Sequence, residues 1–240
     1  MKNIAVILAG GSGKRMGGSL PKQFLILGEK PIIQHSIEAF ENHPQTDEIC
    51  IIIHADFIHE VECIVKENNF KKVRYILPGG KERSDSSLAA IHAYQEEQNI
   101  NLIFHDAVRP FVSSEIISNV IRELNAGKSV AVAITTVDTI FEVDEKNKIV
   151  SVPQRSFLRR AQTPQAFPYN AIKSAYEIAL KDPDFVATDD CGVVLKYLPR
   201  EAIYIVEGDE SNIKITFEGD LVLGEQIMKK KRANSYKFNP

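Results

Sequence analysis

Short apolar runs alternate with amphipathic stretches along this chain. The apolar runs lie at 4–8, 48–54, 72–77, 101–106 and 129–134, with a later one at 202–207. Continuous apolar runs of this length are typical of strands buried on both faces of a parallel sheet. Helices are predicted between them, near 33–40, 57–65, 84–97, 113–126, 169–181 and 188–197, and from about 218. The alternation predicts an α/β fold with a mostly parallel sheet and helices on both faces.

The rhythm changes at residues 135–152, where polar and apolar residues alternate and the cluster "DEKNK" interrupts them. This pattern predicts a β-hairpin with no helix between its strands. An isolated hairpin is marginally stable in water, so we expect it to pack on another surface, such as a second subunit. We therefore predict one domain over 1–240 with an inserted arm.

Composition excludes several classes of protein. The 240 residues carry a formal net charge of −3, so no overall basic field attracts nucleic acid. The three cysteines, Cys50, Cys63 and Cys191, form no C-x-x-C pair, which argues against a disulfide framework or structural zinc. The five apolar residues before the first glycines are too few for the apolar core of a signal peptide, so none is expected. No apolar run approaches the roughly 18 residues of a membrane span. A cytoplasmic protein without a membrane partner is expected.

The first strand leads into a glycine-rich loop, "ILAGGSGKRMG", at residues 7–17. A dinucleotide-binding G-x-G-x-x-G fingerprint fails at Met16, and a P-loop fails at Leu8 and at Arg15. Successive glycine amides can still form an anion-binding nest, to which Arg15 and Lys22 add positive charge. A plain turn with solvated Lys and Arg side chains is the alternative.

Two further strand ends carry candidate site residues. In "PGGKERSDSSLAAI", Gly79 and Gly80 would let a base approach the backbone, whereas Ser84 or Asp85 could serve only as a helix N-cap. In "FHDAVRPFVSSE", His105, Asp106 and Arg109 follow a strand at the edge where parallel sheets bind ligands. Asp106 suits Mg²⁺ and Arg109 an anion, unless the two simply form a structural ion pair.

The second half of the chain adds more basic residues. Arg155, Arg159 and Arg160 precede Thr163-Pro164-Gln165, and they form either a phosphate clamp or a solvated face. Lys214 lies in the apolar run Ile213-Lys214-Ile215, predicted as strand-like. A lysine in such a run often points to solvent, but here it can also reach the predicted site.

Seven motifs occur in order over residues 7–216: L-A-G-G-x-G-x-R-M, P-K-Q-F, G-G-x-x-R-x-x-S, H-D-A-V-R-P, D-T-I, R-x(7)-T-P-Q and N-I-K-I-T. Together they resemble the cytidylyltransferase family that contains the ribitol-5-phosphate and 2-C-methyl-D-erythritol 4-phosphate enzymes. The resemblance implies a Rossmann-like fold of the nucleotide-diphospho-sugar transferase type. It also implies a homodimer in which a dimerisation β-arm, at about 135–165, crosses to the partner's site.

The resemblance implies a role for each matching residue. The loop residues Leu8, Ala9, Gly10, Gly11 and Gly13 would bind the triphosphate of CTP, and Gly80 and Ser86 the cytosine or ribose. Arg15, Lys22 and Lys214 would be catalytic and neutralise phosphate charge. Asp106 would bind Mg²⁺ or the polyol hydroxyls, and Arg109 the polyol phosphate. Thr139, Arg155 and Thr163 would come from the partner's arm and bind the acceptor phosphate.

The implied reaction is attack of a polyol phosphate on the α-phosphorus of CTP, which releases pyrophosphate. Gly10 and Val108, together with "GGKERSDSSLAAI" and "CGVVLKYLP", resemble the ribitol-phosphate branch and favour D-ribitol 5-phosphate. "RRAQTPQAF" also suits the methylerythritol branch, in which many enzymes have Asp at the position of Lys81. A non-catalytic nucleotide-binding module is the alternative of another class, and the intact set Arg15, Lys22, Arg155 and Lys214 argues against it.

Overall fold

The computed structural model describes residues 1–11 and 21–237. Its strands are β1 (Lys2–Ala9), β2 (Ile26–Leu27), β3 (Lys30–Pro31), β4 (Glu48–Ile53), β5 (Val73–Pro78), β6 (Ile100–Asp106), β7 (Ser129–Thr135), β8 (Glu142–Val143), β9 (Ile149–Ser151), β10 (Arg159–Pro168) and β11 (Ile203–Glu207). Its α-helices are α1 (Ile32–Glu41), α2 (Ile58–Glu67), α3 (Arg83–Ala93), α4 (Ser114–Asn125), α5 (Tyr169–Ala179), α6 (Asp190–Tyr197) and α7 (Glu218–Lys237). Short 3-10 helices lie at η2 (Lys22–Phe24), η3 (Ala55–Phe57) and η4 (Arg155–Phe157).

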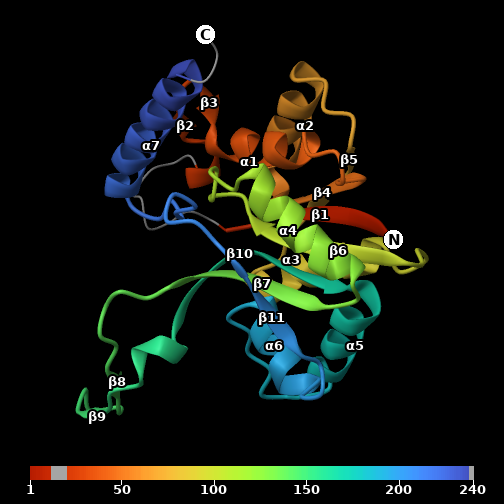
Figure 1. The fold of residues 1–240 in the computed structure, drawn as a ribbon. Coiled ribbons are helices and arrows are strands. Elements are labelled where there is room, and N and C mark those ends of the chain that lie inside the picture. The colour runs from red at the N-terminus through yellow and green to blue at the C-terminus, as the bar shows by residue number, and fades with distance from the viewer. Residues whose placement is uncertain (12–20, 238–240) are drawn as a thin grey trace.

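A seven-stranded sheet with the order β11-β7-β10-β6-β1-β4-β5 forms the centre of the protein (Figure 1). Every neighbouring pair is parallel except those that involve β10. All six predicted strands of the central sheet are present. The mostly parallel α/β fold predicted from the alternation is therefore confirmed.

Alternate residues of the strands supply two separate cores. In β1, Ala5 and Ile7 belong to the core that α1, α2 and α4 cover, whereas Ile4 and Val6 belong to the core beneath α3, α5 and α6. Side chains of a strand point alternately to opposite faces, so each core receives every second residue of β1. Because helices cover both faces of the sheet, both sets of residues are apolar. The prediction of helices on both faces is thus correct.

Strand β10 is the main difference from the sequence-based prediction, which placed residues 159–165 in the arm. The strand pairs antiparallel with both β6 and β7 in the middle of the sheet. Its buried residues include Gln162, Thr163 and Gln165, and Pro164 interrupts its regular pairing with β7. Polar residues and a proline are uncommon in central strands, so the pattern concealed this one.

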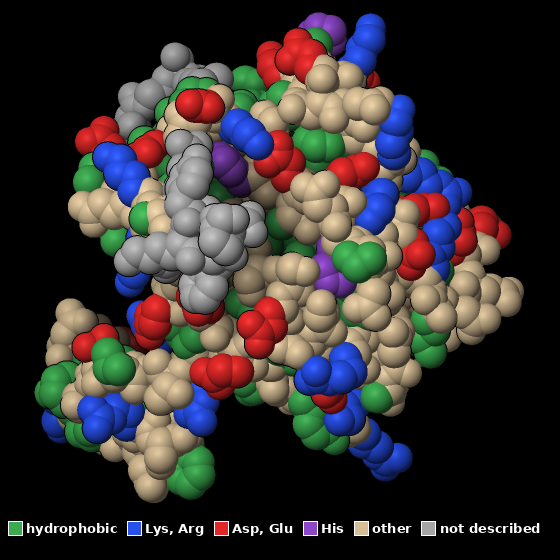
Figure 2. Space-filling view, turned by 45° about the horizontal axis from the view of Figure 1, so that its top comes forward, with side chains coloured by type: hydrophobic (Ala, Val, Ile, Leu, Met, Phe, Trp, Pro, Cys, Tyr) green, Lys and Arg blue, Asp and Glu red, His purple; other side chains and the backbone are tan. Residues whose placement is uncertain are grey.

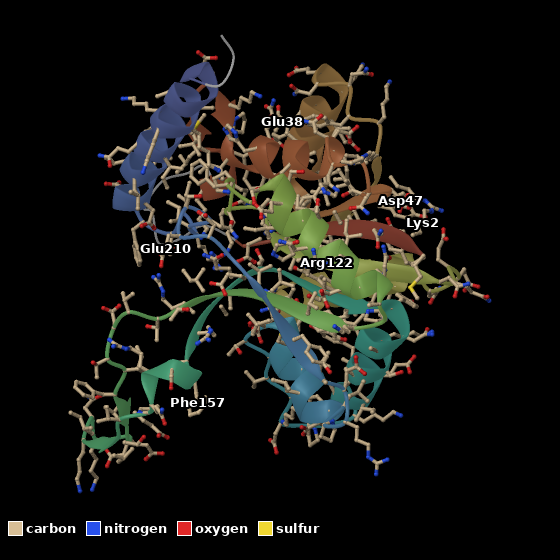
Figure 3. The ribbon with its side chains drawn as sticks, viewed as in Figure 1. Lys2, Glu38, Asp47, Arg122, Phe157 and Glu210 are labelled. Carbon is tan, nitrogen blue, oxygen red and sulfur yellow. The ribbon has the colours of Figure 1, made fainter. Side chains whose placement is uncertain are left out.

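The connection between β7 and β10, residues 136–158, projects from the sheet as the arm (Figure 1). Its tip is the small antiparallel hairpin of β8 and β9, where the predicted hairpin is found. The arm forms a distinct lobe at the lower left of Figure 2, and Phe157 lies on it in Figure 3. Several of its apolar side chains are exposed: Val137, Ile140, Phe141, Val143, Ile149, Val150, Val152 and Phe157.

The C-terminal helix packs beside the small two-stranded sheet of β2 and β3. Helix α7 contributes Leu221, Ile227 and Met228 to a small third core with Leu27 and Ile215. The run around Lys214, predicted as strand-like, forms no strand in the structure. No helix among residues 1–11 and 21–237 is long and apolar enough to cross a membrane.

Candidate functional site

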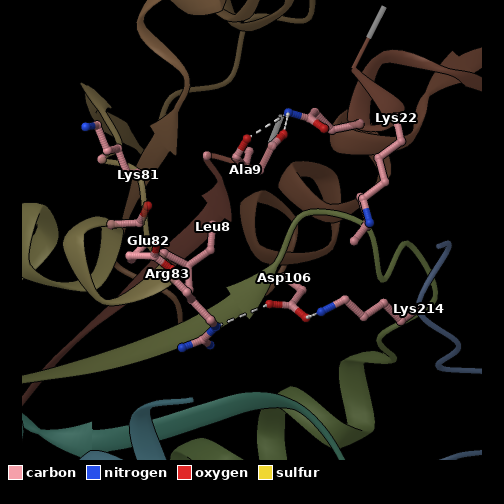
Figure 4. A pocket seen from close by; sticks show the side chains of 14 residues that line it. Leu8, Ala9, Lys22, Lys81, Glu82, Arg83, Asp106 and Lys214 are labelled. Carbon is pink, nitrogen blue, oxygen red and sulfur yellow. Dashed lines mark hydrogen bonds and ion pairs between the residues drawn. The ribbon is translucent and has the colours of Figure 1, made fainter. Parts of the chain in front are cut away.

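A pocket of about 240 Å³ opens at the carboxyl edge of the sheet, between the ends of β1, β5 and β6 (Figure 4). Nine of the predicted site residues line it: Leu8, Ala9, Gly10, Gly11, Lys22, Gly80, Ser86, Asp106 and Lys214. Open α/β sheets bind ligands at this edge, where loops from several strands converge. The structure thus brings residues from five separate sequence motifs into one cavity.

The glycine loop leaves β1 along one wall of this pocket. The side-chain amide of Gln23 donates hydrogen bonds to the carbonyl oxygens of Ala9, at 2.7 Å, and Gly11, at 3.2 Å. Gln23 is buried, so it fixes the path of the loop from behind. The predicted residues Gly13 and Arg15 lie outside the described residues.

Two glycines allow close packing beneath the predicted nucleoside subsite. A Cβ atom at either Gly10 or Gly79 would lie 2.8 Å from the Oγ of Ser86. Any side chain at these positions would push Ser86 away, because real Cβ contacts are essentially never so short.

The Asp85 carboxylate accepts a hydrogen bond from the Glu82 backbone N–H at 3.0 Å, as expected for a residue of the helix start. The helix-capping alternative therefore holds for Asp85.

Asp106 lies at the end of β6 among three cations. Its carboxylate is 2.8 Å from Lys214 Nζ, 3.8 Å from Arg109 Nε and 4.0 Å from Arg83 Nε. Burial alone would raise the pKa of Asp106, but the positive charges of Lys214, Arg83 and Arg109 outweigh it and lower the pKa. Asp106 is therefore an anionic carboxylate at neutral pH. The Lys214 side chain is 43% exposed, yet it lines the pocket and pairs with Asp106, so it reaches the site as the second interpretation predicts.

Behind Asp106, a buried chain of hydrogen bonds fixes the position of its backbone. His105 Nε2 lies 3.0 Å from the carbonyl oxygen of Arg109, which can only accept, so this nitrogen carries the proton. His105 Nδ1 then accepts from the hydroxyl of Thr163, at 3.1 Å. The same hydroxyl oxygen accepts from the backbone N–H of Asp106, also at 3.1 Å. Burial lowers the pKa of His105 to about 4, which keeps the ring neutral.

Thr163 was predicted to come from the arm of a partner subunit, and this prediction is wrong. The residue lies in β10 of the central sheet, where its side chain is buried against Asp106 of the same chain. The sequence pattern places the T-P-Q motif in the arm because the polar residues and the proline of β10 conceal this strand. Thr163 holds the site in place from beneath.

Arg109 also differs from its predicted role as a phosphate ligand. Its Nη1 donates to the backbone carbonyl of Asn212 at 2.8 Å, and its Nε faces Asp106. The side chain is 12% exposed and is absent from the described lining of the pocket. The alternative of a structural ion pair that closes the loop therefore describes Arg109 in this structure.

The arm residues Thr139 and Arg155 do not line the pocket of their own chain. Arg155 donates to the carbonyl oxygen of Val137 at 2.9 Å, across the base of the arm. Arg159 bonds to backbone carbonyls beside it, and Arg160 pairs with Glu210. None of the three arginines is among the described residues that line the pocket, so they form no clamp around it within one chain.

Arg83 is a lining residue that the sequence reasoning left unassigned. It is the arginine of the G-G-x-x-R-x-x-S motif, so the signal was present in the sequence. Its guanidinium pairs with Asp190, a fully buried carboxylate from a distant segment. No sequence spacing indicates that pair.

Comparison with known proteins agrees with this geometry. A family model described as 2-C-methyl-D-erythritol 4-phosphate cytidylyltransferase (IspD) matches residues 3–230. A protein of that name from Thermobifida fusca is 44% identical over 230 residues, which cover 94% of this chain and 92% of the relative.

A second relative has a different name. The bifunctional ribulose 5-phosphate reductase/CDP-ribitol pyrophosphorylase of Haemophilus influenzae is 44% identical over 228 residues, or 94% of this chain. The match covers 48% of that protein, so this chain spans about half of its length.

A solved structure shows the same fold. The 4-diphosphocytidyl-2C-methyl-D-erythritol synthase of Anaerococcus prevotii superposes with a TM-score of 0.84 at 28% identity, covering 95% of this chain and 96% of that one. The resemblance inferred from the seven motifs is confirmed. The family model and the 44% identical relatives each cover nearly the whole chain, and so the protein belongs to the IspD family of CTP-dependent cytidylyltransferases.

Proposed function

We propose that this enzyme transfers CMP from CTP to D-ribitol 5-phosphate, giving CDP-ribitol and pyrophosphate. The observation that carries the proposal is that Gly10 and Val108, the two positions that resemble the ribitol branch, both line the pocket. The relative from Haemophilus influenzae, named as a CDP-ribitol pyrophosphorylase, matches nearly the whole chain.

The nucleotide would occupy the side of the pocket formed by β1 and α3. Backbone amides of residues 9–11, with Gly13 and Arg15, would face the triphosphate, and Lys22 would add positive charge from η2. Gly80 and Ser86 would contact the cytosine or ribose. Because Gly10 has no side chain, the Ser86 hydroxyl can approach its backbone and lie beside the first glycine of the loop at this side of the pocket.

The acceptor would bind near Asp106 and Lys214. Its phosphate oxygen attacks the α-phosphorus of CTP and forms a new P–O bond, while the bond from that phosphorus to the bridging oxygen breaks. Pyrophosphate leaves with the bonding electrons. The acceptor phosphate is already ionised near neutral pH, so the residues need only position the reactants and neutralise charge.

Mg²⁺ is the proposed cofactor, and Asp106 would be its protein ligand. The described residues hold no cluster of three or more metal-ligating side chains. Mg²⁺ nevertheless binds commonly through one or two carboxylates together with substrate phosphates, which is the set that Asp106 and CTP offer. When bound, the ion would neutralise charge on the phosphates, and Lys22 and Lys214 would do so from the protein.

We also propose a homodimer in which the arm reaches the pocket of the partner subunit. The exposed apolar side chains of the arm, Phe157 and Phe141 among them, are left uncovered by the described part of the chain. Thr139 and Arg155 of one chain would then bind the acceptor in the other.

The three free cysteines support a reducing, cytoplasmic compartment.

2-C-methyl-D-erythritol 4-phosphate is the second candidate acceptor, favoured by the names of the matching family model and of the Thermobifida fusca relative. The test is a pyrophosphate-release assay with CTP, Mg²⁺ and each acceptor in turn. We expect kcat/KM for ribitol 5-phosphate to exceed that for the methylerythritol phosphate by at least about tenfold, a difference of 1.4 kcal/mol in transition-state binding. The reverse order would overturn the ribitol assignment. Equal use of UTP or ATP would overturn the choice of CTP.

A further inference from the structure

Lys214 lies on an irregular segment, yet its side chain has a defined place in the pocket. Residues 209–215 form neither a helix nor a strand, so no regular backbone pairing holds them in register. Lys214 Nζ nevertheless lies 2.8 Å from the Asp106 carboxylate, and Figure 4 shows the two side chains pointing toward each other. An ion pair with a partly exposed lysine fixes a backbone only weakly. Other contacts are therefore needed to hold this segment in place.

Asn212 supplies such a contact. It lies two residues before Lys214 and is fully buried. Its Nδ2 donates to the backbone carbonyl oxygen of Thr163 at 3.0 Å and to Gln162 Oε1 at 3.2 Å, and both acceptors belong to β10. One side-chain amide thus attaches the segment of Lys214 to the central sheet. Because these bonds are buried, loss of the donor would leave its acceptors unpaired.

Gln162 completes the attachment from the side of β10. Its Nε2 donates to the backbone carbonyl oxygen of Asp209 at 2.8 Å, while its Oε1 accepts from Asn212. Gly208 makes room for this side chain, since a Cβ atom at that position would overlap Gln162 Oε1. The two amides therefore hold both ends of the turn at residues 209–212 against one strand.

Thr163 joins this attachment to Asp106. Its hydroxyl oxygen accepts from the backbone N–H of Asp106 at 3.1 Å, and its carbonyl oxygen accepts from Asn212. The carboxylate and the segment of the lysine are thus both placed by the same residue of β10. The distance between Asp106 and Lys214 is therefore set by the sheet as well as by their own attraction.

We infer that Asn212, with Gln162 as its partner, is a positioning residue that holds Lys214 beside Asp106 for the transfer step. Neither amide is among the described residues that line the pocket, so both act through the backbone of residues 209–215. This inference rests on the proposed function, in which Lys214 neutralises phosphate charge. It is the same for either acceptor.

The first test is Asn212→Leu, which keeps the side-chain volume and removes the donor. We expect kcat and kcat/KM for pyrophosphate release to fall together by roughly 10- to 100-fold, because a misplacement of about 1 Å can cost that much. Asn101→Leu is the matched control. Asn101 is also fully buried, donates to Asn3 Oδ1 at 2.9 Å and lies at the opposite end of β6 from Asp106. It should lose stability but keep the wild-type kcat, and equal losses of kcat in the two variants would overturn the inference.

A double-mutant cycle with Lys214→Met tests whether the effect passes through the lysine. In the Lys214→Met background, Asn212→Leu should lower kcat by at most about a further twofold, because the lysine that it positions is already gone. Independent, multiplicative losses would show that Asn212 acts through stability alone. Should Asn212→Leu not fold, Gln162→Met removes the same link from the side of β10 and takes its place in the cycle.

Hydrogen exchange gives a readout that needs no turnover. The backbone N–H of Ile215, the residue after Lys214, donates to the carbonyl oxygen of Val108 at 2.9 Å. In Asn212→Leu this amide should exchange at least about tenfold faster than in the wild type, because the segment opens locally more often. In Asn101→Leu it should exchange as in the wild type. Unchanged protection of Ile215 in Asn212→Leu would refute the positioning role.

These measurements separate the inference from the proposed function. A wild-type protein that transfers CMP to neither polyol phosphate would overturn the proposed function, and the exchange of Ile215 would still decide whether Asn212 holds the segment of Lys214. Wild-type transfer together with an unchanged kcat in Asn212→Leu would overturn the inference alone.

Discussion

Lys214 Nζ lies 2.8 Å from the carboxylate of Asp106, and the segments that carry the two residues are joined at further points. The backbone N–H of Ile215 donates to the carbonyl oxygen of Val108, and Arg109 donates to that of Asn212. The two segments therefore form one rigid wall of the pocket. Changes to single side chains in this wall should alter chemistry more than folding.

Lys214→Met should lower kcat by roughly 10²- to 10³-fold, the usual effect of removing one stabilising donor from an active site. The variant would lose the cation proposed to face developing phosphate charge, and it leaves Asp106 without its nearest positive partner. Steady-state pyrophosphate release is the measurement. Lys196→Met, which removes an exposed lysine paired with Asp182, is the control and should keep wild-type turnover.

Lys22→Ala should give a folded protein that assembles as the wild type does but lacks cytidylyl transfer, because the side chain at the pocket wall would neutralise the triphosphate. Circular dichroism and size-exclusion chromatography check folding and assembly, and a coupled pyrophosphate assay checks turnover. Lys30→Ala removes a lysine that pairs with Glu38 away from the pocket and serves as the control. Unchanged turnover in Lys22→Ala would refute the catalytic assignment of this lysine.

His105 should make the protein less stable as the pH falls from about 6.5 to 4. Burial lowers its pKa in the folded state to about 4, whereas an unfolded histidine takes up its proton near 6.5. Between these values the unfolded state binds more protons, so the free energy of unfolding decreases by up to about 3 kcal/mol.

Urea unfolding at several pH values, compared between the wild type and His105→Gln, isolates this contribution. Glutamine keeps an N–H donor but does not titrate, so its stability should depend less on pH over this range. Parallel pH profiles for the two proteins would contradict the prediction.

Thr163→Val should cost about 1–3 kcal/mol of stability, because the buried N–H of Asp106 loses its acceptor. The substitution preserves shape, so the loss reflects the missing hydroxyl. Turnover should fall as well, since Asp106 is no longer fixed from beneath. Thermal unfolding and kcat together check this, and an unchanged kcat would show that the hydroxyl serves stability only.

The proposed crossing of the arm predicts complementation between two inactive variants. Arg155→Ala damages the arm and Lys22→Ala damages the pocket. In a mixed dimer the intact pocket of one chain meets the intact arm of the other. Random mixing should restore about a quarter of wild-type activity, because half of the dimers are mixed and each has one complete site. No recovery in dimers shown to be mixed would mean that each arm serves its own chain.

Much of the fold and of the site followed from local sequence patterns. The runs that form β1, β4 and β6 are continuously apolar because both faces of the sheet are covered, and Asp106 follows β6 at the expected edge. β10 was missed because its buried polar residues are satisfied by partners distant in sequence, such as Gln165 with Asp189. The position of Arg83 at the pocket wall could not be predicted for the same reason, because its ion-pair partner Asp190 comes near only on folding.

Because β10 runs antiparallel to β7, the segment between them can vary in length without loss of strand pairing in the sheet. Since β7 runs toward the pocket edge and β10 returns from it, the chain between them is a loop at that edge rather than a crossover beneath the sheet. Residues can be inserted or removed there without altering any strand pairing in the core. The loop can therefore change in length and in sequence while the sheet and the residues that line the pocket stay the same.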